Sequence, residues 1–256
     1  MTDHEDEALV ALLQDKYNQC ENRSQTTHTG FLDAHEVGVA EQFCRDHRIR
    51  HRMDGGYNDA ERCVCLFLTE WDGDDEPAPL SVLRVTAKKG ARPLTHRDYL
   101  GSILALGIDR SLIGDILVGP ADGEHPQETD LVVLSDMADY LAREYASVGR
   151  ETVTNQILPI SELNTAEIHV ETISDTVASL RLDSIIGTAF HLSRGSAQEA
   201  IKRGLVYLNS REATKADKQV NQGDKVTLRG KGKAVLAEIG NKSKKDRTFI
   251  RIERYL

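Results

Sequence analysis

The stretch Ser179–Asn209, SLRLDSIIGTAFHLSRGSAQEAIKRGLVYLN, carries the clearest fold signal in the chain. Its first apolar residues recur at i, i+3, i+4, i+7 and i+8, namely Leu182, Ile185, Ile186, Ala189 and Phe190. This spacing predicts a helix with one apolar face. A second helix follows, with Ser193 or Ser196 as its N-cap and Gly204 at its end.

Small strands are predicted after this helix pair. Leu205–Asn209 indicates a short strand, residues 221–224 (NQGD) a turn, and Lys225–Arg229 a strand in which basic and apolar residues alternate. The segment therefore predicts a compact module of two helices and small strands.

Charge divides the chain unevenly. The net charge is −9, yet residues 180–256 hold 17 Lys+Arg and 8 Asp+Glu, which gives +9 and leaves −18 for the first 179 residues. A basic module on an acidic body indicates a polyanionic partner, most often a nucleic acid. A solvated basic face without a partner is the alternative.

The C-terminal segment resembles the S4 RNA-binding domain. The resemblance rests on Arg181-Leu182-Asp183, Ser193-Arg194, Ala197, Ile201–Val206, Asn209 and Gly223-Asp224. In such domains the second helix and the loop after it present basic side chains to folded RNA. The resemblance implies RNA contacts from Arg181, Ser193, Arg194, Lys202, Arg203, Asn209, Lys215 and Arg229. Phosphate contacts of this kind supply affinity and salt dependence rather than sequence reading.

Residues 80–160 predict the order β-α-β-β-α-β. The strands are Leu80–Ala87, Ile113–Val118, Asp130–Leu134 and Thr152–Leu158, and the helices are Thr95–Leu106 and Ser135–Ala146, the latter with Met137, Tyr140 and Leu141 inward. This is the pattern of a ferredoxin-like plait, which RNA-recognition motifs share with many unrelated proteins. The aromatic residues with which RNA-recognition motifs stack bases are missing from these strands.

A basic loop follows the first of these strands. Together with that strand and the start of the next helix, it carries Arg84, Lys88, Lys89, Arg92, His96 and Arg97. Because Thr95 would cap the next helix, the amides of that helix start could add to an anion site. We expect Lys88, Lys89, Arg92 and Arg97 to contact the RNA backbone, with a mobile solvated loop as the alternative. Lys242, Lys244, Lys245 and Arg247 either extend this footprint or form a charged hairpin tip.

The first 75 residues predict a small α/β domain. It would contain a helix around residues 5–17, a second helix after the Asp33/Glu36 capping box, and a buried strand over Cys63–Leu68. Residues 71–79, WDGDDEPAP, indicate an exposed acidic linker. The expected fold class is α+β, with domains at 1–75, 80–160 and 179–256.

The whole chain resembles the YlmH-type family of S4-domain RNA-binding proteins. The motifs are Gly55-Gly56-Tyr57, Asp59-Ala60-Glu61-Arg62, His96–Gly101, Leu106-Gly107-Ile108, Ile113–Val118, Ala138–Leu141, Val148-Gly149-Arg150 and Ser179–Asp183. The resemblance implies a non-enzymatic protein that binds large ribosomal subunits obstructed by peptidyl-tRNA, in ribosome-associated quality control. The implied partners are rRNA, peptidyl-tRNA and quality-control factors. The acidic loop and body should face away from RNA, towards a protein or solvent.

Motifs for catalysis and metal binding are weak. His96-Arg97-Asp98 lacks the asparagine that a kinase catalytic loop carries five residues later. Arg181-Leu182-Asp183 resembles the catalytic-Asp motif of pseudouridine synthases, but in those enzymes a large catalytic domain follows the S4 domain. We therefore interpret Asp183 as an acid at the start of a helix. Cys20, Cys44, Cys63 and Cys65 lack zinc spacing, so we interpret them as buried small hydrophobic side chains. We expect no cofactor and no metal. An RNA-modifying enzyme and a cell-division protein adaptor remain the alternative functions.

Composition bears on location. No stretch approaches ~18 consecutive apolar residues, and the N-terminus lacks the features of a signal peptide. The four cysteines show no pairing scheme typical of secreted proteins. The expectation is a cytoplasmic protein without a membrane partner.

Overall fold

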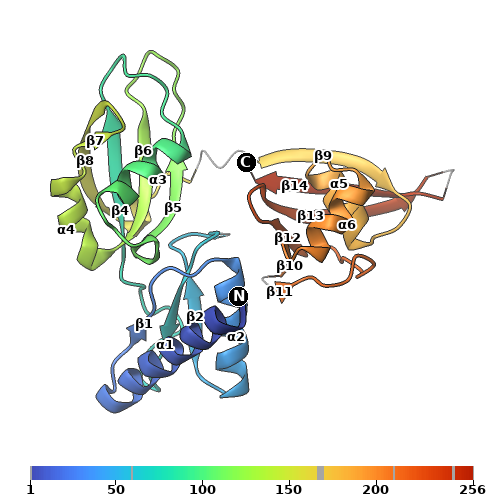
Figure 1. The fold of residues 1–256 in the computed structure, drawn as a ribbon, viewed down its shortest axis with the longest axis horizontal. Coiled ribbons are helices and arrows are strands. Elements are labelled where there is room, and N and C mark those ends of the chain that lie inside the picture. Colours follow the sequence, from blue (N-terminus) through green and yellow to red (C-terminus); the bar gives the residue numbers. More distant parts are fainter. Residues whose placement is uncertain (1, 59, 166–169, 210, 244–245, 256) are drawn as a thin grey trace. The chain divides into compact units, whose positions relative to one another are not determined.

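The computed structural model describes residues 2–58, 60–165, 170–209, 211–243 and 246–255. The chain folds into two compact units, Met1–Glu167 and Ile168–Leu256 (Figure 1). Both units mix helices with antiparallel strands, as the sequence predicted. Across the described residues, no helix combines the length and apolarity needed to span a membrane.

The first unit begins with a small three-stranded sheet under two helices (Figure 1). The sheet order is β1-β3-β2, and the elements are α1 (Thr2–Arg23), β1 (Thr27–His28), α2 (Ala34–Asp46), β2 (His51–Asp54) and β3 (Val64–Phe67). The predicted capping box is present, because Asp33 accepts from the Glu36 N–H and Glu36 accepts from the Asp33 N–H. Leu9 and Leu13 of α1 are buried, whereas Leu12 of the same helix is 41% exposed.

A five-stranded antiparallel sheet forms the rest of the first unit. Its order is β5-β6-β4-β8-β7, with β4 (Leu80–Ala87), α3 (His96–Ala105), the 3-10 turn η1 (Arg110–Leu112), β5 (Ile113–Val118), β6 (Glu128–Leu134), α4 (Ser135–Glu144), β7 (Ser147–Val148), β8 (Glu151–Pro159) and η2 (Ile160–Glu162). The predicted β-α-β-β-α-β order is confirmed, with the short β7 added. Tyr99 and Ile103 of α3 and Leu141 of α4 are buried in its core. Tyr140 does not point inward as predicted but is 42% exposed.

The two sheets of the first unit share a core. Alternate residues of β3 serve two layers, because Cys65 and Phe67 pack under α1 and α2 while Val64 and Leu66 pack against the larger sheet. That second layer holds Phe31, Val64, Leu66, Leu68, Leu80, Val132 and Leu134. The sequence predicted a domain boundary at residues 71–79, and the segments on both sides of it join in this one layer.

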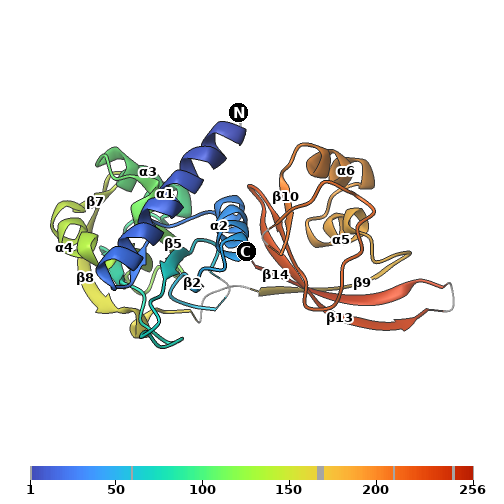
Figure 2. The ribbon, with the colours of Figure 1, turned by 90° about the horizontal axis from the view of Figure 1, so that it is seen from below.

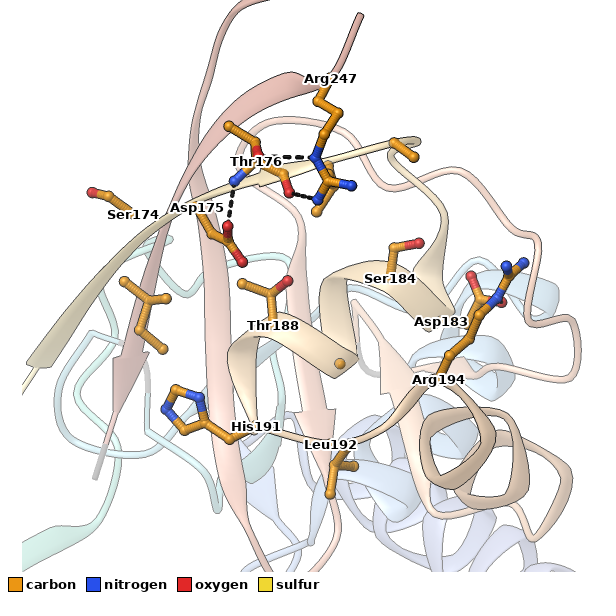
Figure 3. A pocket seen from close by; sticks show the side chains of 14 residues that line it. Ser174, Asp175, Thr176, Asp183, Ser184, Thr188, His191, Leu192, Arg194 and Arg247 are labelled. Atoms are coloured by element: carbon orange, nitrogen blue, oxygen red, sulfur yellow. Dashed lines mark hydrogen bonds and ion pairs between the residues drawn. The ribbon is translucent and has the colours of Figure 1, made fainter. Parts of the chain in front are cut away.

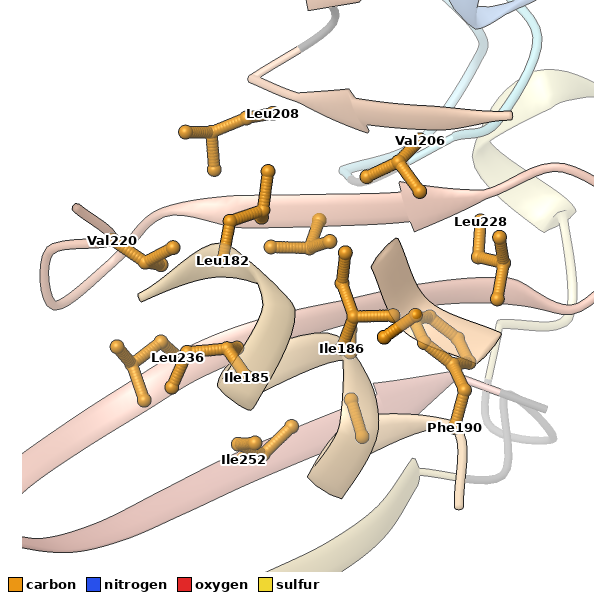
Figure 4. Close-up of a cluster of buried hydrophobic side chains, with 14 of the residues drawn as sticks. Leu182, Ile185, Ile186, Phe190, Val206, Leu208, Val220, Leu228, Leu236 and Ile252 are labelled. Atoms are coloured by element: carbon orange, nitrogen blue, oxygen red, sulfur yellow. The ribbon is translucent and has the colours of Figure 1, made fainter. Parts of the chain in front are cut away.

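The second unit is a six-stranded antiparallel sheet with order β11-β10-β12-β13-β14-β9, and α5 and α6 lie on one face of it (Figure 2). Its elements are β9 (Val170–Val177), α5 (Leu182–Ala189), α6 (Arg194–Lys202), β10 (Val206–Leu208), β11 (Arg211–Glu212), β12 (Lys225–Leu228), β13 (Gly232–Lys242) and β14 (Thr248–Tyr255). All five residues of the predicted apolar helix face are buried in the core between helices and sheet (Figure 4). Strand β9, which precedes the predicted start at residue 179, pairs with β14 along its whole length.

Candidate RNA-binding surface

A buried carboxylate organises the helix pair of the second unit. Asp183, in the first turn of α5, is 0% exposed. It accepts hydrogen bonds from Arg181 (3.1 and 3.0 Å), from Gln198 of α6 (2.9 Å) and from Arg194 at the start of α6 (3.3 Å). Burial raises the pKa of Asp183, but these hydrogen bonds and the Arg181 charge outweigh it and hold the pKa at about 2. Asp183 therefore holds the guanidinium groups of Arg181 and Arg194 close together beside the starts of α5 and α6.

The loop before β12 runs along the start of α5. The N–H groups of Leu182 and Asp183 donate to the carbonyl oxygens of Lys218 and Ala216, at 2.8 and 3.0 Å. These bonds satisfy two amides of the helix start, so they are not open to a phosphate. They also place the exposed Lys215 in the loop that borders Arg181. Arg194, whose side chain is 67% exposed, completes this cationic group beside the helix starts.

A second cationic group lies at the other end of α6. Lys202 and Arg203 are exposed in its last turn, where positive charge is favourable to the helix dipole. Gly204 ends the helix with φ +68°, a conformation that favours glycine. The exposed Arg229 joins this group, because its N–H donates to the Leu205 carbonyl oxygen at 2.8 Å. By helix geometry the two groups are about 12 Å apart along α6.

Two of the predicted RNA-binding residues are engaged within the fold. Ser193, rather than Ser196, caps α6, and its hydroxyl accepts from the Ser196 N–H at 3.1 Å. Asn209 adopts φ 51° in a turn, and its amide group bonds to Asp224 (2.8 Å) and to the Lys225 N–H (2.9 Å). Both side chains hold backbone in place, so any RNA contact from them would compete with these bonds.

A hollow of about 550 Å³ lies between α5 and the edge strand β9 (Figure 3). Arg194 borders it on one side and Arg247 on the other, with Thr176, Ser184 and Thr188 between them. Arg247 is held by Thr176, to whose hydroxyl it donates at 2.9 Å. Among the other cations predicted near the C-terminus, Lys242 pairs with Asp246 at 2.7 Å, and Lys244 and Lys245 fall outside the described residues.

Only some of the cations predicted around the basic loop of the first unit are exposed without a paired acid among the described residues; others form ion pairs within the chain. Lys88, Lys89 and Arg97 are exposed, as expected. Arg92 instead donates to Asp98 at 2.7 Å, and this hydrogen bond holds the pKa of Asp98 well below its usual range. Arg84 forms a bidentate pair, at 2.8 Å for both bonds, with Asp130, whose side chain is 3% exposed.

Part of the sheet face opposite α3 and α4 is covered, so RNA could not bind across the whole of this face of the five-stranded sheet. Leu80, Val82 and Arg84 of β4 alternate away from the helix side, and Leu80 packs in the core shared with the small sheet. Residues 162–164 cover Arg84 and Asp130, since the Glu162 carbonyl accepts from Arg84 and the Asn164 N–H donates to Asp130. RNA contacts by this unit would therefore come from its loop, not from the covered part of the sheet.

Several motifs quoted for the family resemblance meet at one internal acid. The Asp115 carboxylate of β5 accepts from the Tyr57 hydroxyl (2.7 Å) and from the N–H groups of Glu61 (2.7 Å) and Arg62 (3.2 Å). Burial and the neighbouring Asp115 charge raise the pKa of Tyr57, so the phenol stays protonated and donates. Both carboxylate oxygens are occupied by donors of this chain. Asp115 thus ties the segment before β3 to the larger sheet; the neighbouring Asp59 is outside the described residues.

The thiols pack as the sequence predicted, as buried small side chains. Cys20, Cys44 and Cys65 lie in the core under α1 and α2, with Cys63 packed against it. The Cys65 hydrogen bond lowers the pKa of Cys44. Within the described part of the chain, no group of three or more His, Cys, Asp or Glu side chains could hold a metal ion.

Known proteins resemble this chain in sequence and in fold. Residues 79–162 match the family described as "Putative RNA-binding domain in YlmH". The chain is 30% identical over 227 residues to the ribosome-associated protein quality control protein P2 of Bacillus subtilis, covering 88% of this chain and 86% of that protein. The solved structure of the cell division protein YlmH from Streptococcus pneumoniae matches 62% of this chain and 93% of its own, with a TM-score of 0.50 and 19% identity.

Proposed function

The chain belongs to the YlmH family, and we propose that it binds large ribosomal subunits that carry peptidyl-tRNA, in ribosome-associated quality control. It would contact rRNA and the tRNA as a non-enzymatic binding protein in the cytoplasm, alongside other quality-control factors. The name of its Bacillus subtilis relative and the description of the family matched by residues 79–162 both support this proposal.

The observation that carries the proposal is the cationic surface of α5 and α6. Its exposed members are Arg194, Lys202, Arg203, Lys215 and Arg229, with Arg181 held beside them. Asp183 holds the side chains of Arg181 and Arg194, so these two lose less side-chain freedom when they bind. Surplus positive charge on a rigid surface suits the phosphate backbone of folded RNA, which is recognised mainly by shape and charge.

We assign the RNA contacts to two places. The module from residue 179, extended by β9, would act as an S4-type domain and provide most of the affinity. The body at 80–160 would act as a ferredoxin-like, RRM-like plait that contacts RNA through Lys88, Lys89 and Arg97 of its loop and α3, because part of its sheet is covered. The predicted domain at residues 1–75, which belongs to the acidic part of the chain, would not contact RNA.

Sucrose-gradient sedimentation of the tagged protein tests this function directly. Large subunits with and without peptidyl-tRNA are compared across a salt series. We expect enrichment with the obstructed subunits and a steep loss as salt rises, since phosphate contacts release counterions. A chain that stays at the top of the gradient at low salt would contradict the proposed function.

A further inference from the structure

Trp71 is the single tryptophan of the sequence, and it is 86% exposed. It lies in the loop between β3 and β4, outside the buried clusters of the first unit. An indole in water contributes little to folding, whereas tryptophan is strongly enriched among the side chains that dominate protein–protein binding. This exposure therefore needs an explanation other than stability.

Several hydrogen bonds hold the loop that carries Trp71. Asp72 accepts from the Thr26 hydroxyl at 2.5 Å and from the Thr69 N–H at 2.6 Å, and the Trp71 N–H donates to the Thr69 hydroxyl at 3.3 Å. Arg52 of β2 and Arg50, directly before that strand, hold the remainder. Arg50 donates to the Thr69 carbonyl and the Asp74 carboxylate, and Arg52 donates to the carbonyls of Asp74 and Glu76. A loop fixed in this way presents the indole with little further ordering cost on binding.

The charge around Trp71 identifies the class of partner. The segment Glu70–Glu76, here called the Trp71 loop, carries Glu70, Asp72, Asp74, Asp75 and Glu76. Arg50 and Arg52 offset part of this charge, and Arg52 is also paired with Asp54 at 2.9 Å. An exposed aromatic ring could stack on a nucleic-acid base, but that base brings phosphates close to these carboxylates. A protein surface rich in lysine and arginine is the complementary partner.

We propose that the Trp71 loop is a docking site for a partner protein that presents Lys and Arg side chains around an apolar recess for the indole. The basic rim would pair with the acidic side chains, and the recess would bury the ring. This interaction goes beyond the proposed function: α5 and α6 would bind RNA, and the Trp71 loop would bind a protein through chemistry of the opposite sign.

Site-specific photocrosslinking in cells tests the docking site. The photoreactive amino acid p-benzoyl-phenylalanine replaces Trp71 in the full-length tagged chain. The same substitution at Tyr140, an aromatic residue of α4 that is 42% exposed, is the matched control. We expect position 71, and not position 140, to crosslink to one protein at a segment rich in Lys and Arg. Sedimentation of the same variant reports on ribosome binding separately, so the two proposals fail independently.

Charge-reversed variants test whether the crosslink at position 71 depends on the acidic side chains of the Trp71 loop. Glu70→Lys with Asp75→Lys should remove most of the crosslink at position 71, whereas the same reversal at Asp139 and Glu144 of α4 should leave it unchanged. Trp71→Ala should weaken binding of the purified partner on the order of 30-fold, as truncation of a dominant interface residue does, with an unchanged thermal midpoint. Crosslinks to RNA, a yield no higher than at Tyr140, or a crosslink insensitive to the Glu70/Asp75 reversal would each overturn the docking site.

Discussion

The Arg181 guanidinium donates two parallel hydrogen bonds to the Asp183 carboxylate, with Nε–Oδ1 and Nη2–Oδ2 distances of 3.1 and 3.0 Å. The acceptor is fully buried, and the Arg181 side chain is 31% exposed. A paired acid therefore holds a cation at the edge of the surface that we assign to RNA. This relationship couples the stability of the second unit to the charge of its binding surface.

Asp183→Asn should destabilise the second unit. The native carboxylate has a pKa of about 2 against a usual value of 3.8, so its ionised form contributes on the order of 2 kcal/mol at neutral pH. Because the folded-state pKa is the lower one, this contribution is complete above about pH 4 and is lost as the pH falls towards 2. Chemical denaturation at pH 7 and at pH 2.5 measures it.

The pH series contains its own control. The difference in unfolding free energy between the wild type and Asp183→Asn should shrink as the pH falls below 4. A difference that stays constant down to pH 2 would mean that Asp183 does not act through its charge. Gln198→Ala removes one neutral donor to the same carboxylate and should cost less than Asp183→Asn.

Reversal of charge at Lys202, Arg203 and Arg229 should greatly weaken binding to large subunits without unfolding the chain. All three side chains are exposed, so the fold should tolerate glutamate there. Loss of three phosphate contacts should reduce the slope of log affinity against log salt by about 2 to 3. Binding to purified large subunits, measured across a salt series, tests both effects.

Arg194 is better neutralised than reversed. A glutamate at this position would place a second carboxylate near the buried Asp183, so loss of binding could reflect unfolding. Arg194→Gln removes the charge and keeps a hydrogen-bond donor. As a control for net charge, the reversal of Lys231 and Arg251, two exposed cations elsewhere in the second unit, is compared with the reversal of Lys202 and Arg203. If this control lost binding to the same extent, net charge and not the α5–α6 surface would explain the effect.

In the first unit, Lys88→Ala with Lys89→Ala should weaken RNA binding more than Arg92→Ala. The two lysines are exposed after β4, whereas Arg92 is paired with Asp98 and offers less charge to a phosphate. Filter binding with a fragment of large-subunit rRNA compares the variants. Equal losses from Arg92→Ala would show that the Asp98 pair opens on binding.

The sequence was most informative where structure is decided locally. The capping box at Asp33 and the apolar face from Leu182 to Phe190 depend on residues within a few turns, and both were predicted correctly. Strands β9, β13 and β14 were not predicted, because their outward positions are charged or polar. The partner of β9 also lies far along the chain, whereas β13 and β14 form a hairpin, one of the two alternatives that the sequence left open for residues 242–247.

The roles of the acids depended on distant partners. Asp183 looked like a helix-start acid, and only the approach of α6 brings Arg194 and Gln198 to it. One sequence signal could have indicated a paired acid: Asp183 directly follows Leu182, the first residue of the apolar helix face, and Arg181 lies two residues before it. Lys88, Lys89 and Arg97 were proposed from charge alone and are exposed, but the pairing of Arg92 with Asp98 requires the turn between them.

Asp115→Ala should destabilise the first unit more than Tyr57→Phe does. Removal of the carboxylate leaves the Tyr57 hydroxyl and the N–H groups of Glu61 and Arg62 without their acceptor, at a cost of about 2–4 kcal/mol. Tyr57→Phe removes a single donor and should cost about 1 kcal/mol. Because these bonds join the segment before β3 to β5, hydrogen exchange in Asp115→Ala should increase around residues 57–62 and leave α5 and α6 unchanged. If ribosome binding fell while the first unit kept its stability and exchange pattern, Asp115 would belong to the binding surface and not to the internal joint.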